Sequence, residues 1–280
     1  MKVLITKASG KQVEFSAAKL RASLEKSGAN DETINTIVTQ VKAQLYDGIP
    51  SKTIYQTAFE LLKQSSHPFA AKYKLKQAIM ELGPAGYAFE IFIGEILKYQ
   101  GFRTEVGVIV RGHCVNHEID VVAEKDEKHF MVECKYHNHK GTVCDVKIPL
   151  YIQARFKDVE MHWKSLPGHG TKFHQGWLVT NTRFSDDAIQ YGICAGLHLV
   201  GWNFPHRGSL REQIDVSGLY PITCLNTLTS WDKQILLKNK IVLCREICNN
   251  PKILTVNGIE VSRLDSIMKE ARELCKGRAL

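Results

Sequence analysis

The stretch HFMVECKYHNH, residues 129–139, has the pattern of a buried β-strand with one unusual face. Side chains alternate along a strand, so its apolar residues fall on one side and its charged and imidazole residues on the other. Lys and Glu are rarely fully buried without a partner, so an ion pair, a solvated sheet face or a metal-dependent active site would each explain this face. The apolar face would hold Phe130, Val132, Cys134 and Tyr136, and the polar face Glu133, Lys135, His137 and His139.

A second strand is predicted just upstream, in HEIDVVAE at residues 117–124. Its alternation turns Asp120 away from the apolar face, which would hold Ile119, Val121 and Ala123. The polar turn EKDEKH, residues 124–129, predicts that the two strands form a hairpin. That pairing would bring Asp120 close to Glu133 and Lys135.

Two carboxylates that converge in this way repel each other unless a proton or a cation lies between them. Oxygen ligands of this kind suit Mg²⁺, which binds few carboxylates and keeps several waters. A water on that metal, oriented by Lys135, could attack a phosphodiester. The order of Asp120, Glu133 and Lys135 therefore favours a hydrolytic site, although Glu133 and Lys135 taken alone would more often form a cross-strand ion pair.

The D-to-ExK order resembles the signature of PD-(D/E)XK nucleases, and the surrounding sequence is similar to the Mrr-type restriction endonuclease branch. The matching stretches are YAFEIFIGEILKYQGF (87–102), HEIDVVA (117–123), MVECKYHN (131–138) and GWLVTNTRFSDDAIQYG (176–192). The resemblance implies an α/β fold with a restriction-endonuclease-like mixed sheet flanked by helices over residues 85–220. It also implies that Asp120 and Glu133 bind Mg²⁺ and that Lys135 assists the attacking water. Glu90 matches the acidic residue of the first helix, and Gln153, in YIQARF, matches a glutamine of the following helix.

Residues 1–84 form a first module, with the strand pattern KVLITK, a turn and a returning QVEF. Ser16 is placed to cap a helix that Gly28 ends, and further helical patterns run to the breaker Gly83-Pro84. Three lysines, Lys7, Lys11 and Lys19, would lie around one pocket, where they could bind phosphate groups.

The first module resembles the ATP-cone, a nucleotide-sensing α+β domain, in VLITKASGKQVEFSAAKLRASLEKSG (3–28), IYQTAFELL (54–62) and AAKYKLKQAI (70–79). The family usually has two consecutive basic residues where this chain has Lys7 and Ala8, which leaves ATP and dATP both open as ligands. No Walker-type motif occurs, so we expect nucleotide binding as a signal rather than hydrolysis. A basic surface without a ligand is the alternative.

Residues 221–280 form a third, helical module that reads as separate from the middle one. Two helical stretches are predicted, at 230–254 and 262–274, joined by TVNG. The segment 235–275 resembles a helix-hairpin-helix DNA-binding element, which would grip phosphates without reading sequence. A helical packing or dimerisation module fits the same pattern.

The chain has 280 residues and a net charge of +8, which is unevenly distributed. Residues 1–84 carry a net charge of +5, residues 85–220 of −1 and residues 221–280 of +4. A near-neutral middle between two basic ends suits a carboxylate-bearing site flanked by anion-binding modules, or a solvated charged surface. The eight scattered cysteines predict free thiols, and the absence of a long apolar run predicts a cytoplasmic protein that does not contact a membrane.

These patterns together predict a Mg²⁺-dependent DNA endonuclease whose activity or assembly responds to ATP or dATP. The resemblance implies a restriction or defence role, with DNA repair as the nearest rival. A non-catalytic, nucleotide-sensing DNA-binding protein is the alternative from another class. Related cones act by altering subunit contacts, so we expect a homo-oligomer with DNA and a purine nucleotide as its partners.

Overall fold

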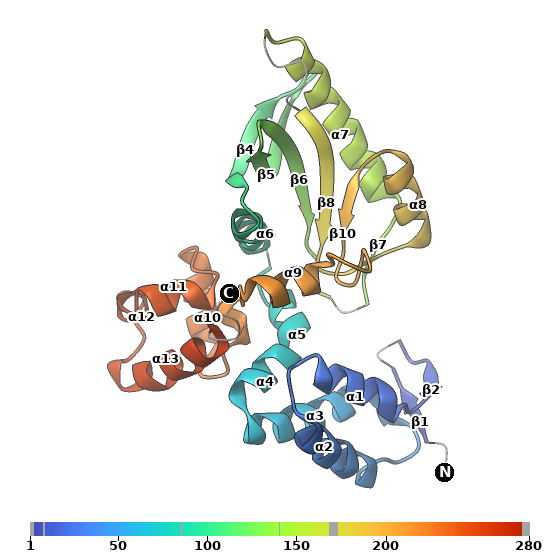
Figure 1. Ribbon diagram of the computed structural model, residues 1–280, viewed down its shortest axis with the longest axis vertical. Helices are drawn as coiled ribbons and strands as arrows, with labels where there is room; N and C mark the ends of the chain where they lie inside the picture. Colours follow the sequence, from blue (N-terminus) through green and yellow to red (C-terminus); the bar gives the residue numbers. More distant parts are fainter. Residues whose placement is uncertain (1–2, 8, 85, 140, 168–172, 276–280) are drawn as a thin grey trace.

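A computed structural model describes residues 3–7, 9–84, 86–139, 141–167 and 173–275 of the chain. Figure 1 shows a central sheet with helices on both sides, a blue and cyan N-terminal unit beneath one end of that sheet, and a red helical unit beside it. The predicted order of α+β module, α/β module and helical module is therefore present.

The N-terminal unit joins a small sheet to a set of helices. Strands β1 (Leu4–Thr6) and β2 (Gln12–Glu14) form the predicted antiparallel hairpin, and β3 (Ile49–Pro50) pairs parallel to β1. The two-residue β3 was not predicted, because so short a strand has no periodicity to read. The hydroxyl of Ser16 accepts a hydrogen bond from the amide of Lys19 and caps the first helix as predicted. The helices are α1 (Ala17–Glu25), α2 (Asp31–Ala43), α3 (Ser51–Ser65), α4 (His67–Tyr73) and α5 (Leu75–Met80).

The central sheet has five strands in the order β10-β8-β6-β5-β4. The β4–β5–β6 part is antiparallel, and β8 and β10 continue the sheet in parallel with β6. This mixed topology matches the fold predicted from the resemblance. The strands are β4 (Arg103–Arg111), β5 (Asn116–Lys125), β6 (Lys128–Lys135), β8 (Phe173–Thr180) and β10 (His198–Val200), and a separate pair is formed by β7 (Val143–Cys144) and β9 (Arg183–Phe184).

Different helices cover the two faces of the sheet. Helix α6 (Tyr87–Tyr99) packs on one face, over Val121, Ala123 and Val132. Helices α7 (Lys147–Lys164) and α8 (Asp186–Cys194) pack on the other face, where α7 covers Met131. Figure 1 shows α6 and α7 on opposite sides of the strands. The β6 strand thus lies between helices on both faces, which explains why its neighbouring residues Met131 and Val132 are both buried.

The C-terminal helices do not have a hydrophobic core of their own. The predicted stretch 230–254 divides into three helices, because Lys240 takes a left-handed φ of 64° and Pro251 interrupts the chain again. Buried residues of these helices join one continuous core with Ile79 and Leu82 at the end of the first unit and Phe89 of α6. The predicted helical module is therefore present, and its core is continuous with the core of the preceding elements. The elements are α9 (Leu210–Ser217), η1 (Ile222–Cys224), α10 (Ser230–Lys238), α11 (Cys244–Asn249), α12 (Lys252–Val256) and α13 (Val261–Cys275).

All eight cysteines are free thiols, as predicted. Among the residues that the structure describes, no helix is both long enough and apolar enough to cross a membrane.

Candidate active site

The candidate site lies where β5 and β6 separate. Backbone pairing between these strands runs from Lys125 and Lys128 to Val121 and Val132 and goes no further. At the next position a side chain replaces the backbone as the hydrogen-bond acceptor. Oδ2 of Asp120 accepts a 2.6 Å hydrogen bond from the amide of Cys134. The hairpin thus brings Asp120 to the strand that carries Glu133 and Lys135, as the sequence predicts.

The apolar face of β5 differs from the prediction. Val121 and Ala123 pack under α6, whereas Ile119 packs with Met131 and Phe156 under α7. The three residues therefore do not share one core, as simple alternation required. The change of partner falls at Asp120, where the ladder to β6 ends.

Glu133 is buried, with only 5% of its surface exposed. Its Oε2 forms a 2.7 Å ion pair with Nη1 of Arg155, while its Oε1 is buried without a hydrogen-bond partner among the described residues. Oε1 of Gln153, on α7, is a second buried oxygen without a hydrogen-bond partner among the described residues. Buried oxygens without partners cost free energy, so both are free to bind a ligand that satisfies them.

Three carboxyl groups influence one another at this point. Burial, followed by the charge of Asp120, raises the pKa of Glu133 to about 8. Burial and then Asp120 also raise the pKa of Glu90, on α6, to about 7. The pKa of Asp120 itself is raised by burial. The structure therefore brings Glu90, Asp120 and Glu133 together, and a cation would relieve their mutual repulsion.

Lys135 follows at the end of β6 and is exposed. Its ammonium forms no hydrogen bond or ion pair with a described residue, and its positive charge acts to lower the pKa of Asp120. The backbone at this position is fixed, because the hydroxyl of Thr180 donates a 2.8 Å hydrogen bond to the carbonyl of Lys135. The side chain of Asn181 likewise holds both backbone groups of His137, at 2.9 and 2.7 Å. The Lys135 ammonium is thus carried by a backbone held in place by hydrogen bonds, and its charge acts on the carboxylate of Asp120.

Arg155 is the site residue that the sequence reasoning missed. Besides its ion pair with Glu133, its Nη2 donates to the carbonyl of Glu118 and its Nε to Nδ1 of His117 at 3.5 Å. His117 in turn contacts Oδ2 of Asp158 at 2.8 Å. The available signal was the buried Glu133 itself, because a buried carboxylate requires a cationic partner and YIQARF offers one.

The donor set fits Mg²⁺. Among the described residues, no group of three or more His, Cys, Asp or Glu side chains is arranged to hold a metal. Mg²⁺ does not need such a group, because it is commonly held by one or two carboxylates, waters and substrate phosphates. Asp120 and Glu133 provide two carboxylates, and one oxygen of Glu133 has no protein partner. The residues present therefore suit this cation better than zinc, which prefers closed sets of Cys and His.

The N-terminal unit has its own cavity, of about 260 Å³. It is lined by Lys7 and Lys19, together with Ser16 at the start of α1 and the rings of Tyr55 and Tyr73. Lys11 is not among the lining residues, and its carbonyl accepts the amide of Lys7 to close the hairpin turn. Two of the three predicted lysines therefore face one cavity, which we call the cone cavity.

Comparisons with known proteins agree with this architecture. Family models match the chain as an ATP cone domain over residues 3–78, as a restriction endonuclease over 84–201 and as an AF1548-like C-terminal domain over 220–275. An uncharacterized protein of Archaeoglobus fulgidus is 36% identical over 186 residues, which are 65% of this chain and 99% of that protein. The chain belongs to the AF1548-like family. The predicted combination of an ATP cone with an Mrr-type restriction endonuclease domain is confirmed.

Two solved structures resemble the AF1548-like chain. The crystal structure of AF1548, a protein of unknown function, is 34% identical, has a TM-score of 0.58 and covers 69% of this chain and all of its own. The MspJI restriction endonuclease in complex with a 27-mer oligonucleotide is 14% identical, with a TM-score of 0.36, and covers 61% of this chain and 36% of its own. The model matched to the C-terminal residues names only the AF1548-like family, so a helix-hairpin-helix role for them stays a prediction.

Proposed function

We propose that this chain is a Mg²⁺-dependent DNA endonuclease that hydrolyses phosphodiester bonds. The observation that supports the proposal most is the buried Glu133, whose Oε1 has no partner among the described residues and which lies near the charge of Asp120. The exposed Lys135 acts on the same Asp120. The ion pair with Arg155 engages Oε2 and leaves the buried Oε1 available to a metal or its waters. The restriction endonuclease domain matched over 84–201 contains all of these residues.

Asp120 and Glu133 would hold the metal, and Glu90 and Gln153 would bind its waters. The metal, when bound, supplies an activated water and polarises the scissile phosphate. Lys135 would orient the attacking water and compensate the negative charge that develops on the phosphate. Arg155 holds Glu133 in one orientation, so we assign it a positioning role.

ATP or dATP would bind in the cone cavity and regulate the nuclease, with Lys7 and Lys19 on the phosphates. The basic C-terminal residues would bind the DNA backbone. In biological terms this is a restriction or defence enzyme, or one of DNA repair, that acts in the cytoplasm as a homo-oligomer. The Archaeoglobus fulgidus relative is an uncharacterized protein and AF1548 is a protein of unknown function, so these roles rest on the matched domains and the charge.

The decisive experiment is nicking of supercoiled plasmid by the purified chain, with Mg²⁺ or with EDTA. Wild type should nick only with Mg²⁺, whereas Asp120→Ala and Lys135→Ala should lose at least about a hundredfold in rate, as expected when a group acting in the transition state is removed. Both variants should still shift a DNA duplex in a gel. Undiminished nicking by either variant would refute the assigned site, and the absence of nicking with retained DNA binding in wild type would favour a non-catalytic DNA-binding protein.

A further inference from the structure

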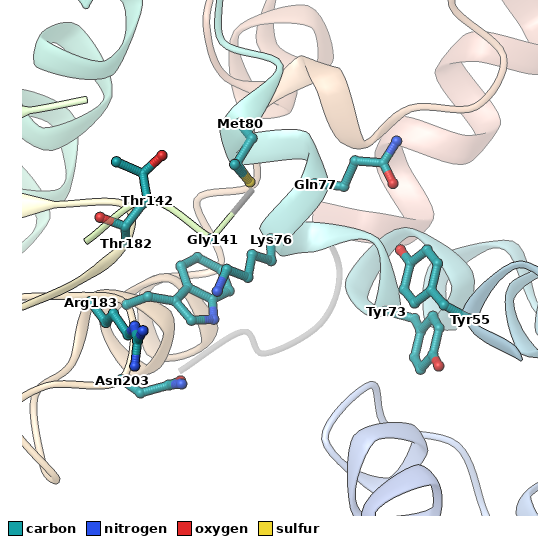
Figure 2. Close-up of a pocket in the computed structure, with 11 residues that line it drawn as sticks. Tyr55, Tyr73, Lys76, Gln77, Met80, Gly141, Thr142, Thr182, Arg183 and Asn203 are labelled. Atoms are coloured by element: carbon teal, nitrogen blue, oxygen red, sulfur yellow. The ribbon is translucent and has the colours of Figure 1, made fainter. Parts of the chain in front are cut away.

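A second cavity, of about 370 Å³, lies between the N-terminal unit and the nuclease sheet. One wall comes from α3 to α5, with Tyr73, Lys76 and Gln77, and the opposite wall from loops of the nuclease unit, with Arg183, Trp202 and Asn203. Figure 2 shows Arg183 and Asn203 on the nuclease side and the rings of Tyr55 and Tyr73 on the other. We call this space the interdomain cavity. Its size lies within the range of small-molecule sites.

The charge of the interdomain cavity is positive. Lys76 enters from α5, with its Nζ 5.7 Å from the ring centre of Trp202, and Arg183 enters from β9. No Asp or Glu is found among the described residues that line the space, and the guanidinium of Arg183 forms no ion pair with a described residue. A cation on each wall favours an anion in the space between them, and a planar guanidinium matches phosphate oxygens well.

The remaining lining groups suit a flat heterocycle. Tyr73 stacks on Tyr55 at 5.0 Å between ring centres, and these rings and Trp202 give the cavity aromatic walls. Gln77 and Asn203 add side-chain amides that can both donate and accept hydrogen bonds. Aromatic walls, amides and cations together are the groups that recognise a base and its phosphates.

We infer that the interdomain cavity is a nucleotide-binding site distinct from the cone cavity. The phosphates lie on Lys76 and Arg183, and the base lies against the aromatic walls. The two sites are neighbours, because Tyr55 and Tyr73 line both cavities. A nucleotide in either site would therefore contact the two tyrosine rings that also line the other site.

Two hydrogen bonds connect the nuclease wall of this cavity to the backbone of Lys135, the candidate catalytic lysine. Thr182, a lining residue, has its hydroxyl 3.1 Å from the hydroxyl of Thr180, which donates to the carbonyl of Lys135. A nucleotide that displaces Thr182 would thus alter the hydrogen bonds at the end of β6. This consequence for the rate of DNA cleavage rests on the proposed nuclease function, whereas the binding site itself does not.

Isothermal titration calorimetry of the full chain with ATP, dATP and AMP tests the inference. We expect Lys19→Ala to retain one binding event, and Lys76→Gln and Arg183→Gln each to weaken that event about tenfold, as loss of one charge-assisted phosphate contact predicts. Inorganic triphosphate, which lacks the base, should bind this site more weakly than ATP. Arg207→Ala is the matched control, because Arg207 is exposed in the same part of the chain but does not line the cavity.

The inference is overturned if Lys19→Ala abolishes all nucleotide binding, if Lys76→Gln and Arg183→Gln titrate like wild type, or if none of the nucleotides binds at millimolar concentration. A single binding event that depends on Lys76 and Arg183 but not on Lys19 would support it while refuting the predicted cone ligand. Because calorimetry does not require cleavage, an inactive nuclease would leave this test intact.

Discussion

Tyr136 donates a 2.6 Å hydrogen bond from its phenol to the carbonyl of Met80. Tyr136 comes directly after Lys135, and Met80 is the last residue of α5, so this bond joins the N-terminal unit to the end of the candidate catalytic strand. Burial raises the pKa of Tyr136 to about 12, so the phenol remains a donor at any physiological pH. Figure 1 shows α5 below the lower end of the sheet, with α9 drawn between them. If the first unit responds to a nucleotide as proposed, this hydrogen bond would connect that response to the end of β6.

Tyr136→Phe should uncouple nucleotide binding from cleavage. The ring keeps its packing against Phe89, 5.6 Å away, while the carbonyl of Met80 loses its donor. Leaving a buried carbonyl unsatisfied costs about 1–3 kcal/mol, so the melting temperature should fall by several degrees. The change in plasmid nicking rate on addition of ATP should shrink towards none, while calorimetry still detects ATP binding.

Tyr99→Phe is a suitable control, because the Tyr99 phenol is exposed and has only a 3.5 Å contact with the carbonyl of Val216. That variant should keep the ATP response of wild type. A full ATP response in Tyr136→Phe would show that the signal takes another path.

The sequence was sufficient to predict that Asp120 and Glu133 lie together, but not that Arg155 forms an ion pair with Glu133. Asp120 and Glu133 are joined by a hairpin whose turn and alternation are local features. Arg155 reaches Glu133 from a helix, and its orientation depends on how α7 packs across the sheet. Such a contact has no short-range signature, so the sequence indicates only that some cation must balance a buried carboxylate.

The link to the N-terminal unit could not be predicted for the same reason. Tyr136 and Met80 are 56 residues apart, and the apolar character of Tyr136 indicates burial but names no partner. The packing partners of the C-terminal helices could not be predicted either. Their amphipathic patterns are those of a small independent bundle, yet their buried residues join one core with residues of α5 and α6.

Arg155→Lys should raise the Mg²⁺ concentration that the nuclease requires. Lysine can replace one contact of the guanidinium, but it cannot bind Glu133, Glu118 and His117 together. Loss of a residue that orients a metal ligand commonly costs about 10–100-fold in metal affinity. The Mg²⁺ dependence of nicking should shift by this factor, with a smaller change in the rate at saturating Mg²⁺.

Arg111→Lys changes an exposed arginine at the end of β4 in the same way and should leave the Mg²⁺ dependence unaltered. If Arg155→Lys and Arg111→Lys gave the same Mg²⁺ dependence as wild type, Arg155 would have no positioning role.

Glu133→Gln should stabilise the metal-free protein at alkaline pH. The folded pKa of Glu133, about 8, lies above the ordinary value of 4.5, so the folded state binds more protons than the unfolded state between these values. The free energy of unfolding therefore falls as pH rises through this window. Glutamine removes the ionisation, so in EDTA the variant should melt close to wild type at pH 6 but at least a few degrees higher at pH 9, with about 2–4 °C expected per kcal/mol.

Glu105→Gln serves as the control for this prediction, because Glu105 is exposed on β4. Its melting temperature should follow wild type at both pH values. A wild-type protein that is equally stable at pH 6 and pH 9 in EDTA would contradict the raised pKa of Glu133.

The last prediction concerns how the C-terminal helices contact DNA. Removing residues 221–280 would expose buried apolar residues of the core that these helices share with α5 and α6. Charge substitutions are therefore the better test. Lys238 and Lys240 are exposed, and Lys240 lies over the ring of Tyr87, with its Nζ 5.2 Å from the ring centre, at the start of the helix that carries Glu90. Lys238→Gln/Lys240→Gln should weaken DNA binding and make the slope of log affinity against log salt shallower by about 1.8, because each phosphate contact contributes about 0.9.

Lys252→Gln/Lys269→Gln removes the same charge from exposed positions on α12 and α13. Fluorescence anisotropy with a labelled duplex, titrated at several salt concentrations, would measure both double variants against wild type. We expect the slope of the control pair to stay close to wild type, because those lysines do not lie beside Tyr87. Equal slopes for both pairs would mean that net charge, rather than a DNA surface next to the candidate active site, determines binding.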